Sequence, residues 1–222
     1  MTVSTDPEAT ADPVASEDGL EPARARRSWF LVIAALLVGT LLGLGIGLVV
    51  PHLRTPGDNS VEAGFLRDMA THHAQAVEMS MIVHQKSTDP EIVYLASDIA
   101  LTQHGQIGYM QAWLRDWNLS PSSTQTPMAW MPDSAGSVVN GLMPGMATPE
   151  QLAALRKATG KELNIQYLTL MRQHHLGGIH MAQEAVKLSS NKDVDWLAQS
   201  MVTSQQGEIT LIDNLLKKLG AS

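Results

Sequence analysis

Cysteine is absent from the 222 residues, which excludes disulfides, thiolate nucleophiles, Cys-ligated zinc and iron–sulfur clusters. Any metal must therefore be held by His, Met, Asp, Glu or amide groups, and the chain has 8 His and 12 Met. Positive charge is scarce, with 15 Lys+Arg against 22 Asp+Glu, so the basic surface that binds phosphates is lacking and nucleic acid is not an expected partner. Aromatic residues make up only 5% and alternating β-branched runs are few, which favours a helical protein.

Charged residues are also absent from residues 29–50, which read WFLVIAALLVGTLLGLGIGLVV. At about 1.5 Å per residue this helix covers a hydrocarbon core of about 30 Å, and it is longer than the apolar part of a typical signal peptide. We expect a retained single-pass anchor, with cleavage as the alternative. Arg24, Arg26 and Arg27 precede the span and Arg54 alone follows it, which places the N-terminus in the cytoplasm and the C-terminal domain on the periplasmic or cell-wall side.

The segments around this span have simpler expected roles. Residues 1–28 are polar and poor in large apolar groups, which predicts a disordered cytoplasmic tail, and residues 51–59 form a linker. Within the span, Gly39, Gly43 and Gly47 follow the GxxxG spacing that lets two membrane helices approach, so a homodimer is one interpretation. Glycine is frequent in membrane helices in any case, and this interpretation is therefore not the preferred one.

The rest of the chain contains an internal repeat, in which residues 65–115 align with 167–217 without a gap. FLRDMATHHAQAVEMS matches YLTLMRQHHLGGIHMA, and LASDIALTQHGQI matches LAQSMVTSQQGEI. Asp89 and Asn191 occupy matching N-cap positions, so each copy is a helical hairpin, and Thr148 opens a capping box before the second copy. Neither hairpin can bury its apolar face alone. We therefore predict an all-α four-helix bundle over residues 60–219, with hairpin 1 at 60–118, a Met/Pro-rich connection at 119–147 and hairpin 2 at 148–219.

Polar side chains interrupt the apolar faces of these helices. His72 shares a face with apolar residues three and four positions away, as does His174, and the next helix of each copy carries a Gln-x-x-Gln/Glu pair on its own apolar face. Buried groups of this kind cost about 1–3 kcal/mol each when unpartnered, so they should bond each other, a metal or water. The candidate ligands are Met69, His72, His73, Gln103 and Gln106 in copy one and Met171, His174, His175, Gln205 and Glu208 in copy two, with His180 as an accessory candidate.

Two interpretations of this set stay open. In one, the groups form a hydrogen-bonded network that fixes helix register and has no further role. In the other, they bind a metal, and the soft thioether sulfur favours copper over zinc. A ferritin-type di-iron site is excluded, because these faces carry one carboxylate, Glu208, and the chain has no Glu-x-x-His element. No hydrolase, metalloprotease or phosphate-loop motif is present, and no catalytic residue is predicted.

The remaining histidines and methionines have weaker signals. We interpret His52, His84 and His104 as surface or boundary residues, since each stands alone. Two Met-x-x-Met spacings in the connection either pass a soft ion to the bundle or fill gaps beneath a long loop, and packing is the favoured interpretation. These methionines are Met128, Met131, Met143 and Met146.

MATHHAQAVEM, MRQHHLGGIHM, the Gln-x-x-Gln/Glu-Ile elements and LMPGMATPEQL together resemble the bacterial family known as domain of unknown function 305. The resemblance covers roughly residues 60–218, and it implies a ferritin-like four-helix fold that is usually exported or anchored to the envelope. For some relatives it also implies copper binding or copper tolerance. Gln106 departs from the pattern, which has Glu there, so only the second half of the site has an anionic group. Gly177 and Gly178 leave room for a close neighbour beside His175.

The leading hypothesis is a membrane-anchored, extracytoplasmic protein that sequesters or passes on copper without turnover. Its main alternative is a structural or partner-binding bundle of an envelope or respiratory complex, whose partner the sequence does not identify. A metal-dependent redox enzyme is disfavoured, because Glu208 is the only carboxylate among the candidate residues.

Overall fold

The computed structural model describes residues 2, 21–132, 134 and 136–221, which divide between two compact units, Met1–Thr55 and Pro56–Ser222. In the described residues of the first unit there is one helix, α1 (Glu21–Arg54). Most of the predicted disordered tail lies outside the described residues, but residues 21–28 are helical, because EPARARR is rich in strong helix formers. The helix also takes in residues 51–54 of the predicted linker and ends before Thr55, whose helical conformation is disfavoured by Pro56.

Helix α1 contains the predicted apolar span. Within the described residues, Trp29–Gly47 is the one stretch long and apolar enough to cross a membrane, with a mean hydropathy of 2.5 and no buried residue. Its large side chains, such as Trp29 and Leu41, are about two-thirds exposed within the protein. By length and composition α1 fits a membrane anchor or a signal sequence.

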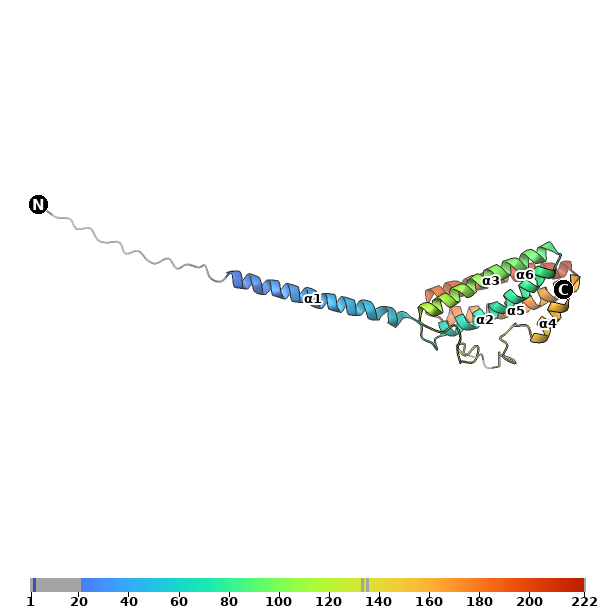
Figure 1. The fold of residues 1–222 in the computed structure, drawn as a ribbon, viewed down its shortest axis with the longest axis horizontal. Coiled ribbons are helices and arrows are strands. Elements are labelled where there is room, and N and C mark those ends of the chain that lie inside the picture. The colour runs from blue at the N-terminus through green and yellow to red at the C-terminus, as the bar shows by residue number, and fades with distance from the viewer. Residues whose placement is uncertain (1, 3–20, 133, 135, 222) are drawn as a thin grey trace. The chain divides into compact units, whose positions relative to one another are not determined.

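Five helices make up the described part of the second unit, and four of them are long (Figure 1). The predicted N-caps are confirmed: Asp89 accepts from Glu91 N, Asn191 accepts from Asp193 N and Val194 N, and Thr148 forms a capping box with Gln151. The helices are α2 (Val61–Lys86), α3 (Pro90–Asp116), α4 (Pro149–Lys157), α5 (Gly160–Leu188) and α6 (Lys192–Lys218).

The long helices pack in pairs. Helix α2 packs against α3, α5 packs against α6, and the two pairs meet mainly through α2 and α5. Helices α3 and α6 make few contacts with each other. They run antiparallel, because Lys218 near the end of α6 pairs with Glu91 at the start of α3, and Trp196 near the start of α6 lies close to Tyr109 toward the end of α3. The all-α prediction is therefore confirmed, with paired helices.

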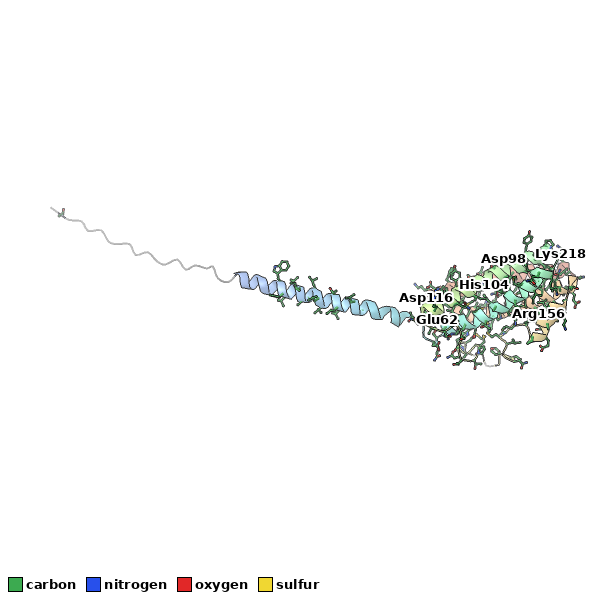
Figure 2. The ribbon with its side chains drawn as sticks, in the orientation of Figure 1. Glu62, Asp98, His104, Asp116, Arg156 and Lys218 are labelled. Atoms are coloured by element: carbon green, nitrogen blue, oxygen red, sulfur yellow. The ribbon has the colours of Figure 1, made fainter. Side chains whose placement is uncertain are left out.

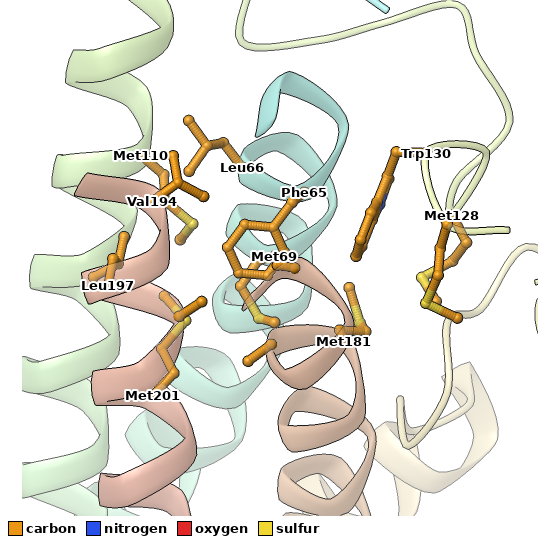
Figure 3. Close-up of a cluster of buried hydrophobic side chains, with 14 of the residues drawn as sticks. Phe65, Leu66, Met69, Met110, Met128, Trp130, Met181, Val194, Leu197 and Met201 are labelled. Atoms are coloured by element: carbon orange, nitrogen blue, oxygen red, sulfur yellow. The ribbon is translucent and has the colours of Figure 1, made fainter. Parts of the chain in front are cut away.

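Two hydrophobic clusters fill the interior of the bundle. The first, here called the Met128 cluster, includes Phe65, Met69, Met128, Trp130, Met181 and Met201 (Figure 3). The second, here called the Tyr167 cluster, includes Met79, Val83, Ile99, Tyr167, Met171 and Ile212. Burying this apolar surface is the main stabilising contribution to the fold, at about 25 cal/mol per Å².

The connection between the hairpins is held against α2 and α5. The carboxylate of Asp68 accepts hydrogen bonds from Met128 N (2.6 Å) and Trp130 Nε1 (2.9 Å), and the amide of Gln75 bonds both N and O of Ala147. A Cβ on Gly177 would lie 1.9 Å from Pro144 O, so only glycine lets the connection approach α5 at that point. The connection therefore covers the face formed by α2 and α5.

Candidate functional site

Four histidines lie in the middle of the bundle, where sequence reasoning placed them. His72 and His73 on α2 and His174 and His175 on α5 are at most 1% exposed. Along α2 they follow Met69 of the Met128 cluster and precede residues of the Tyr167 cluster, and along α5 the order is reversed. The histidines thus form a polar layer between two apolar clusters.

Each histidine uses its Nε2 atom in a hydrogen bond. His72 Nε2 lies 3.0 Å from Pro144 O, and His174 Nε2 lies 2.9 Å from the backbone oxygen of His72. His73 Nε2 lies 2.8 Å from Gln106 Oε1, and His175 Nε2 bonds the carboxylate of Glu208. All four partners are oxygen acceptors, so Nε2 carries the proton in each ring and donates it. In the neutral imidazole, Nδ1 then has the free lone pair.

The four Nδ1 atoms are buried and have no hydrogen-bond partner within the described part of the chain. The same holds for both amide atoms of Gln103 and for Oε1 of Gln205, each on a side chain 2% exposed. These atoms come from all four long helices, α2, α3, α5 and α6. All of these atoms except the donor Gln103 Nε2 are acceptors, and a cation or water would satisfy them, because an unmade bond costs about 1–3 kcal/mol per group.

Close packing brings the histidines of α2 and α5 together. The rings of His72 and His174 stack with centroids 3.8 Å apart and an interplanar angle of 35°. A Cβ on Gly178 would lie 2.7 Å from Gln205 Oε1 and 3.4 Å from His72 Cε1. The glycine predicted to admit a close neighbour therefore admits the amide of α6 and the imidazole of α2, and that prediction is confirmed.

Burial keeps His72, His73 and His174 neutral at pH 7. It lowers the pKa of His72 to about 4, against a smaller opposing effect of the hydrogen bond to Pro144. It lowers the pKa of His73 to about 3, with His72 adding to the effect. The pKa of His174 is likewise held well below its ordinary value by burial and by the neighbouring histidines. Neutral imidazole is the form that ligates metals, so the rings need not lose a proton at pH 7.

The two copies differ in the side chain that holds the second histidine. Gln106 and Glu208 occupy matching positions, and each bonds the Nε2 atom of the histidine 33 residues earlier. Glu208 keeps 12% of its side chain exposed, so an anionic group reaches from the surface to His175. The expected inward orientation of both histidine pairs is confirmed. His73 and His175 bond the expected amide and carboxylate, whereas His72 and His174 bond backbone oxygens.

Other candidate residues fall outside this layer. Met69 and Met171 are fully buried, one in each hydrophobic cluster, and His180 is exposed. His84 and His104 are exposed as expected, the latter labelled in Figure 2, whereas the side chain of His52 lies outside the described residues. In the connection, Met128, Met131 and Met143 are buried in the Met128 cluster and Met146 packs against it, which supports their interpretation as packing residues.

The layer offers atoms that could ligate a metal, but its carboxylate and imidazole groups do not form a complete coordination sphere. Within residues 21–132, 134 and 136–221, no three His, Asp or Glu side chains are grouped closely enough to hold one ion. Binding there requires the imidazoles to turn or an amide or thioether to join them. The stacked rings of His72 and His174 identify where such a movement must occur.

Asp68 and Gln75 were missed as contacts of the connection. Neither residue is among the sequence candidates, because copy two has Leu170 in place of Asp68 and Gly177 in place of Gln75. Together with His72, which bonds Pro144, these residues lie on one face of α2 at spacings of four and three, and all three contact the connection. That polar spacing was a usable signal.

Comparison with known proteins gives a consistent result. The family model described as Domain of unknown function (DUF305) matches residues 62–216. Among solved structures, a DUF305 protein from Streptomyces coelicolor described as secreted is 42% identical, with a TM-score of 0.69 over 75% of this chain and 98% of that one. A DUF305 fragment from Deinococcus radiodurans is 28% identical, with a TM-score of 0.60 over 71% and 96% of the two chains. CopM in its Cu(II)-bound form is 24% identical, with a TM-score of 0.56 over 72% and 97%, and this likeness shows a shared fold. No curated protein matches the sequence.

Proposed function

The chain belongs to the DUF305 family, and on that premise we propose that it is a membrane-anchored, extracytoplasmic protein that binds copper in the polar layer of its helical bundle. The observation that carries this proposal is the set of four buried Nδ1 lone pairs, contributed by two helices and left unpaired because every Nε2 donates elsewhere. The fold it shares with CopM, which was solved with Cu(I) and Cu(II), supports the choice of metal.

The proposed architecture is a ferritin-like four-helix bundle built from two duplicated hairpins, α2–α3 and α5–α6. Support comes from matching contacts at matching positions of the sequence repeat: His73 with Gln106 in one hairpin and His175 with Glu208 in the other. The same repeat places His72 and His174 in one stack. A protein assembled in this way brings two equivalent halves of a site together at its centre.

The residues present fit copper as cargo. His72, His73, His174 and His175 would supply imidazole nitrogen, and the amide oxygens of Gln103 and Gln205 are likewise buried and unpaired. Met69 and Met171 would add soft sulfur from the borders of the layer, which favours Cu(I) over zinc. Glu208 would orient His175 and offset part of the ion's charge, since a carboxylate on the far nitrogen of a ligating histidine fixes its tautomer and raises its basicity.

The proposed location follows from α1 and its flanks. Arg24, Arg26 and Arg27 on one side and Arg54 on the other favour a cytoplasmic N-terminus. The relative from Streptomyces coelicolor described as secreted supports an extracytoplasmic bundle. Retention of α1 as an anchor remains a prediction, and so does the homodimer suggested by Gly39, Gly43 and Gly47.

Copper loading of the full-length chain in detergent micelles tests the proposal. The protein is incubated with Cu(I) under reducing conditions and desalted, and retained copper and thermal stability are measured. A ligand that binds only the folded state at about 100 times its Kd adds about 2.7 kcal/mol, which corresponds to a rise in Tm on the order of 5–10 °C. We expect stoichiometric copper and a rise of that size.

A pair of variants separates the buried histidines from adventitious surface binding. In the first, His72, His73, His174 and His175 are changed to Gln, and we expect copper retention to be lost. In the matched control, the exposed His84 and His104 are changed to Gln, and we expect copper to bind as in the wild type. Retention by the first variant, or a wild type that retains no copper, would favour the alternative of a structural bundle whose histidines only fix helix register.

A further inference from the structure

The two halves of the α3–α6 face have different side chains along the gap between the helices. Toward the start of α3, a groove with a volume of about 570 Å³ lies between the helices. Its walls include Tyr94 and Asp98 of α3 and Gly207, Glu208 and Leu211 of α6. The position of Asp98 on this side of the bundle is labelled in Figure 2.

Glu208 links this groove to the polar layer. Its side chain lines the groove, and its carboxylate bonds Nε2 of His175, which is fully buried. A single side chain therefore spans from the groove to a candidate ligand. Asp98 places a further carboxylate along the same groove, whereas the carboxylate of Glu91 is paired with Lys218. The apolar walls from Tyr94 and Leu211 strengthen the attraction of Glu208 and Asp98 for a cation.

The other half of this face is covered by aromatic rings. The repeat pairs Gly207, Glu208 and Leu211 with Gly105, Gln106 and Tyr109. The ring of Tyr109 packs near Trp113 (centroids 6.0 Å apart) and near Trp196 across the gap to α6 (6.5 Å, edge to face). Here the side chain that reaches the buried histidine is a neutral amide, and aromatic rings bridge the two helices beside it.

The opposite side of the polar layer is covered by the connection. Pro144 accepts the hydrogen bond of His72, and its carbonyl fits against Gly177 of α5. A Cβ on Gly145 would lie 2.3 Å from Gln173 O, so backbone contacts backbone along this side. An ion entering there would have to displace these contacts.

We propose that the α3–α6 groove beside Glu208 is the port through which copper ions enter and leave the buried histidine layer, and that the Glu208 carboxylate attracts the ion to the groove beside His175. This port rests on the proposed function. In this proposal the groove and the Glu208 half of the site serve ion entry and exit. The half with Tyr109 and Trp196, and the α2–α5 face covered by the connection, serve stability.

The test narrows the groove and leaves the buried layer intact. A Cβ on Gly207 meets nothing within 4 Å, and the same is true of its counterpart Gly105, so a side chain can begin at either position without contacting the backbone. Phenylalanine is the side chain introduced at each. The full-length chain in micelles is mixed in a stopped-flow instrument with Cu(I) held by bicinchoninate, and loading is followed by the loss of that complex's colour. We expect Gly207→Phe to slow loading and unloading about tenfold or more, with the same final copper content, and Gly105→Phe to load within about twofold of the wild type.

Each possible result has a defined meaning. If Gly207→Phe loads at the wild-type rate, or if Gly105→Phe is the slower variant, the port is overturned and the proposed function stands. If the wild type takes up no copper by the end of the reaction, the proposed function fails and the port fails with it. Should Gly207→Phe not fold, as judged by circular dichroism and Tm, Ser204→Tyr narrows the same groove, with its repeat counterpart Thr102→Tyr as control.

Discussion

The two hairpins carry the same histidine pair but differ in the contacts made by the residues around it. In α2, Asp68 and Gln75 hold the connection, whereas the matching positions in α5 are Leu170 and Gly177, which offer no polar side chain. On α3 the histidine partner is the amide of Gln106, whereas on α6 it is the carboxylate of Glu208. The first hairpin therefore secures the long connection, and the second carries the carboxylate that bonds a buried histidine. Matching positions of the sequence repeat thus have different contacts in the two hairpins.

Acid pH is expected to have the largest effect on stability. It tests the half of the site that contains His72, His73 and the amide of Gln106. His72 and His73 have pKa values of about 4 and about 3 in the folded protein, against 6.5 when unfolded. The unfolded state therefore binds more protons than the folded state below pH 6.5, and stability falls as pH drops from 6.5 through 4. Each group contributes up to about 1.4 kcal/mol per pH unit in this window. Denaturant unfolding at a series of pH values measures the slope.

A carboxylate at position 106 should flatten this dependence. Gln106→Glu gives protonated His73 the kind of partner that His175 already has, so the folded state tolerates its charge better. The slope of stability against pH should therefore be shallower in Gln106→Glu than in the wild type. Equal slopes would show that the identity of the partner does not distinguish the halves.

Gly177 tests the contact between the connection and the second hairpin. The added methyl group of Gly177→Ala would lie 1.9 Å from Pro144 O, so the connection must move away from α5. We expect a loss of about 3 kcal/mol, the upper part of the range for overpacked sites, measured by thermal or denaturant unfolding. Gly207→Ala is the matched control, because its Cβ enters open space, and it should be neutral or stabilising by up to about 1 kcal/mol. A Gly177→Ala protein as stable as this control would mean that the connection is not held there.

The charge difference between the halves should appear in copper affinity. Glu208→Gln keeps the shape of the side chain and removes its charge, which converts the second half into a copy of the first. We expect Cu(I) affinity to fall about tenfold to a hundredfold, as is usual when the partner of a ligating histidine is altered. Competition with a chromophoric chelator measures the change. The combined variant Glu208→Gln with Gln106→Glu should recover most of the affinity if the halves are interchangeable.

Sequence reasoning succeeded where the two copies agree. The helix caps at Asp89, Thr148 and Asn191 and the inward direction of the histidine pairs followed from local chemistry and from a pattern seen twice. The partners of His72 and His174 could not be predicted, because both are backbone oxygens, and every residue type has one. A backbone acceptor leaves no mark in the sequence and becomes known only from the tertiary fold.

The repeat also misled where the copies differ. The repeat does not single out Asp68, because Leu170 stands at its counterpart, yet Asp68 contacts the connection, which occurs once in the chain. A residue that contacts a unique segment has no reason to recur in a duplicated helix. Similarly, the open groove at Glu208 depends on Leu211 standing where the other copy has Tyr109, a difference that gains meaning only when α3 and α6 are placed side by side.

The smallest predicted effect comes from Asp68, and it tests whether charge or shape holds the connection to the first hairpin. Burial raises the pKa of this carboxyl, while Met128 N and Trp130 Nε1 donate to one of its oxygens. Asp68→Asn retains an oxygen that can accept both bonds and loses only the charge, so we expect a cost of about 1 kcal/mol and an unchanged fluorescence maximum for Trp130. Asp68→Leu, the residue of the other copy, leaves both donors unpaired and should cost about twice as much, with a shift in that maximum. Equal losses in the two variants would indicate that the negative charge, and not the accepting oxygen, is what the connection needs.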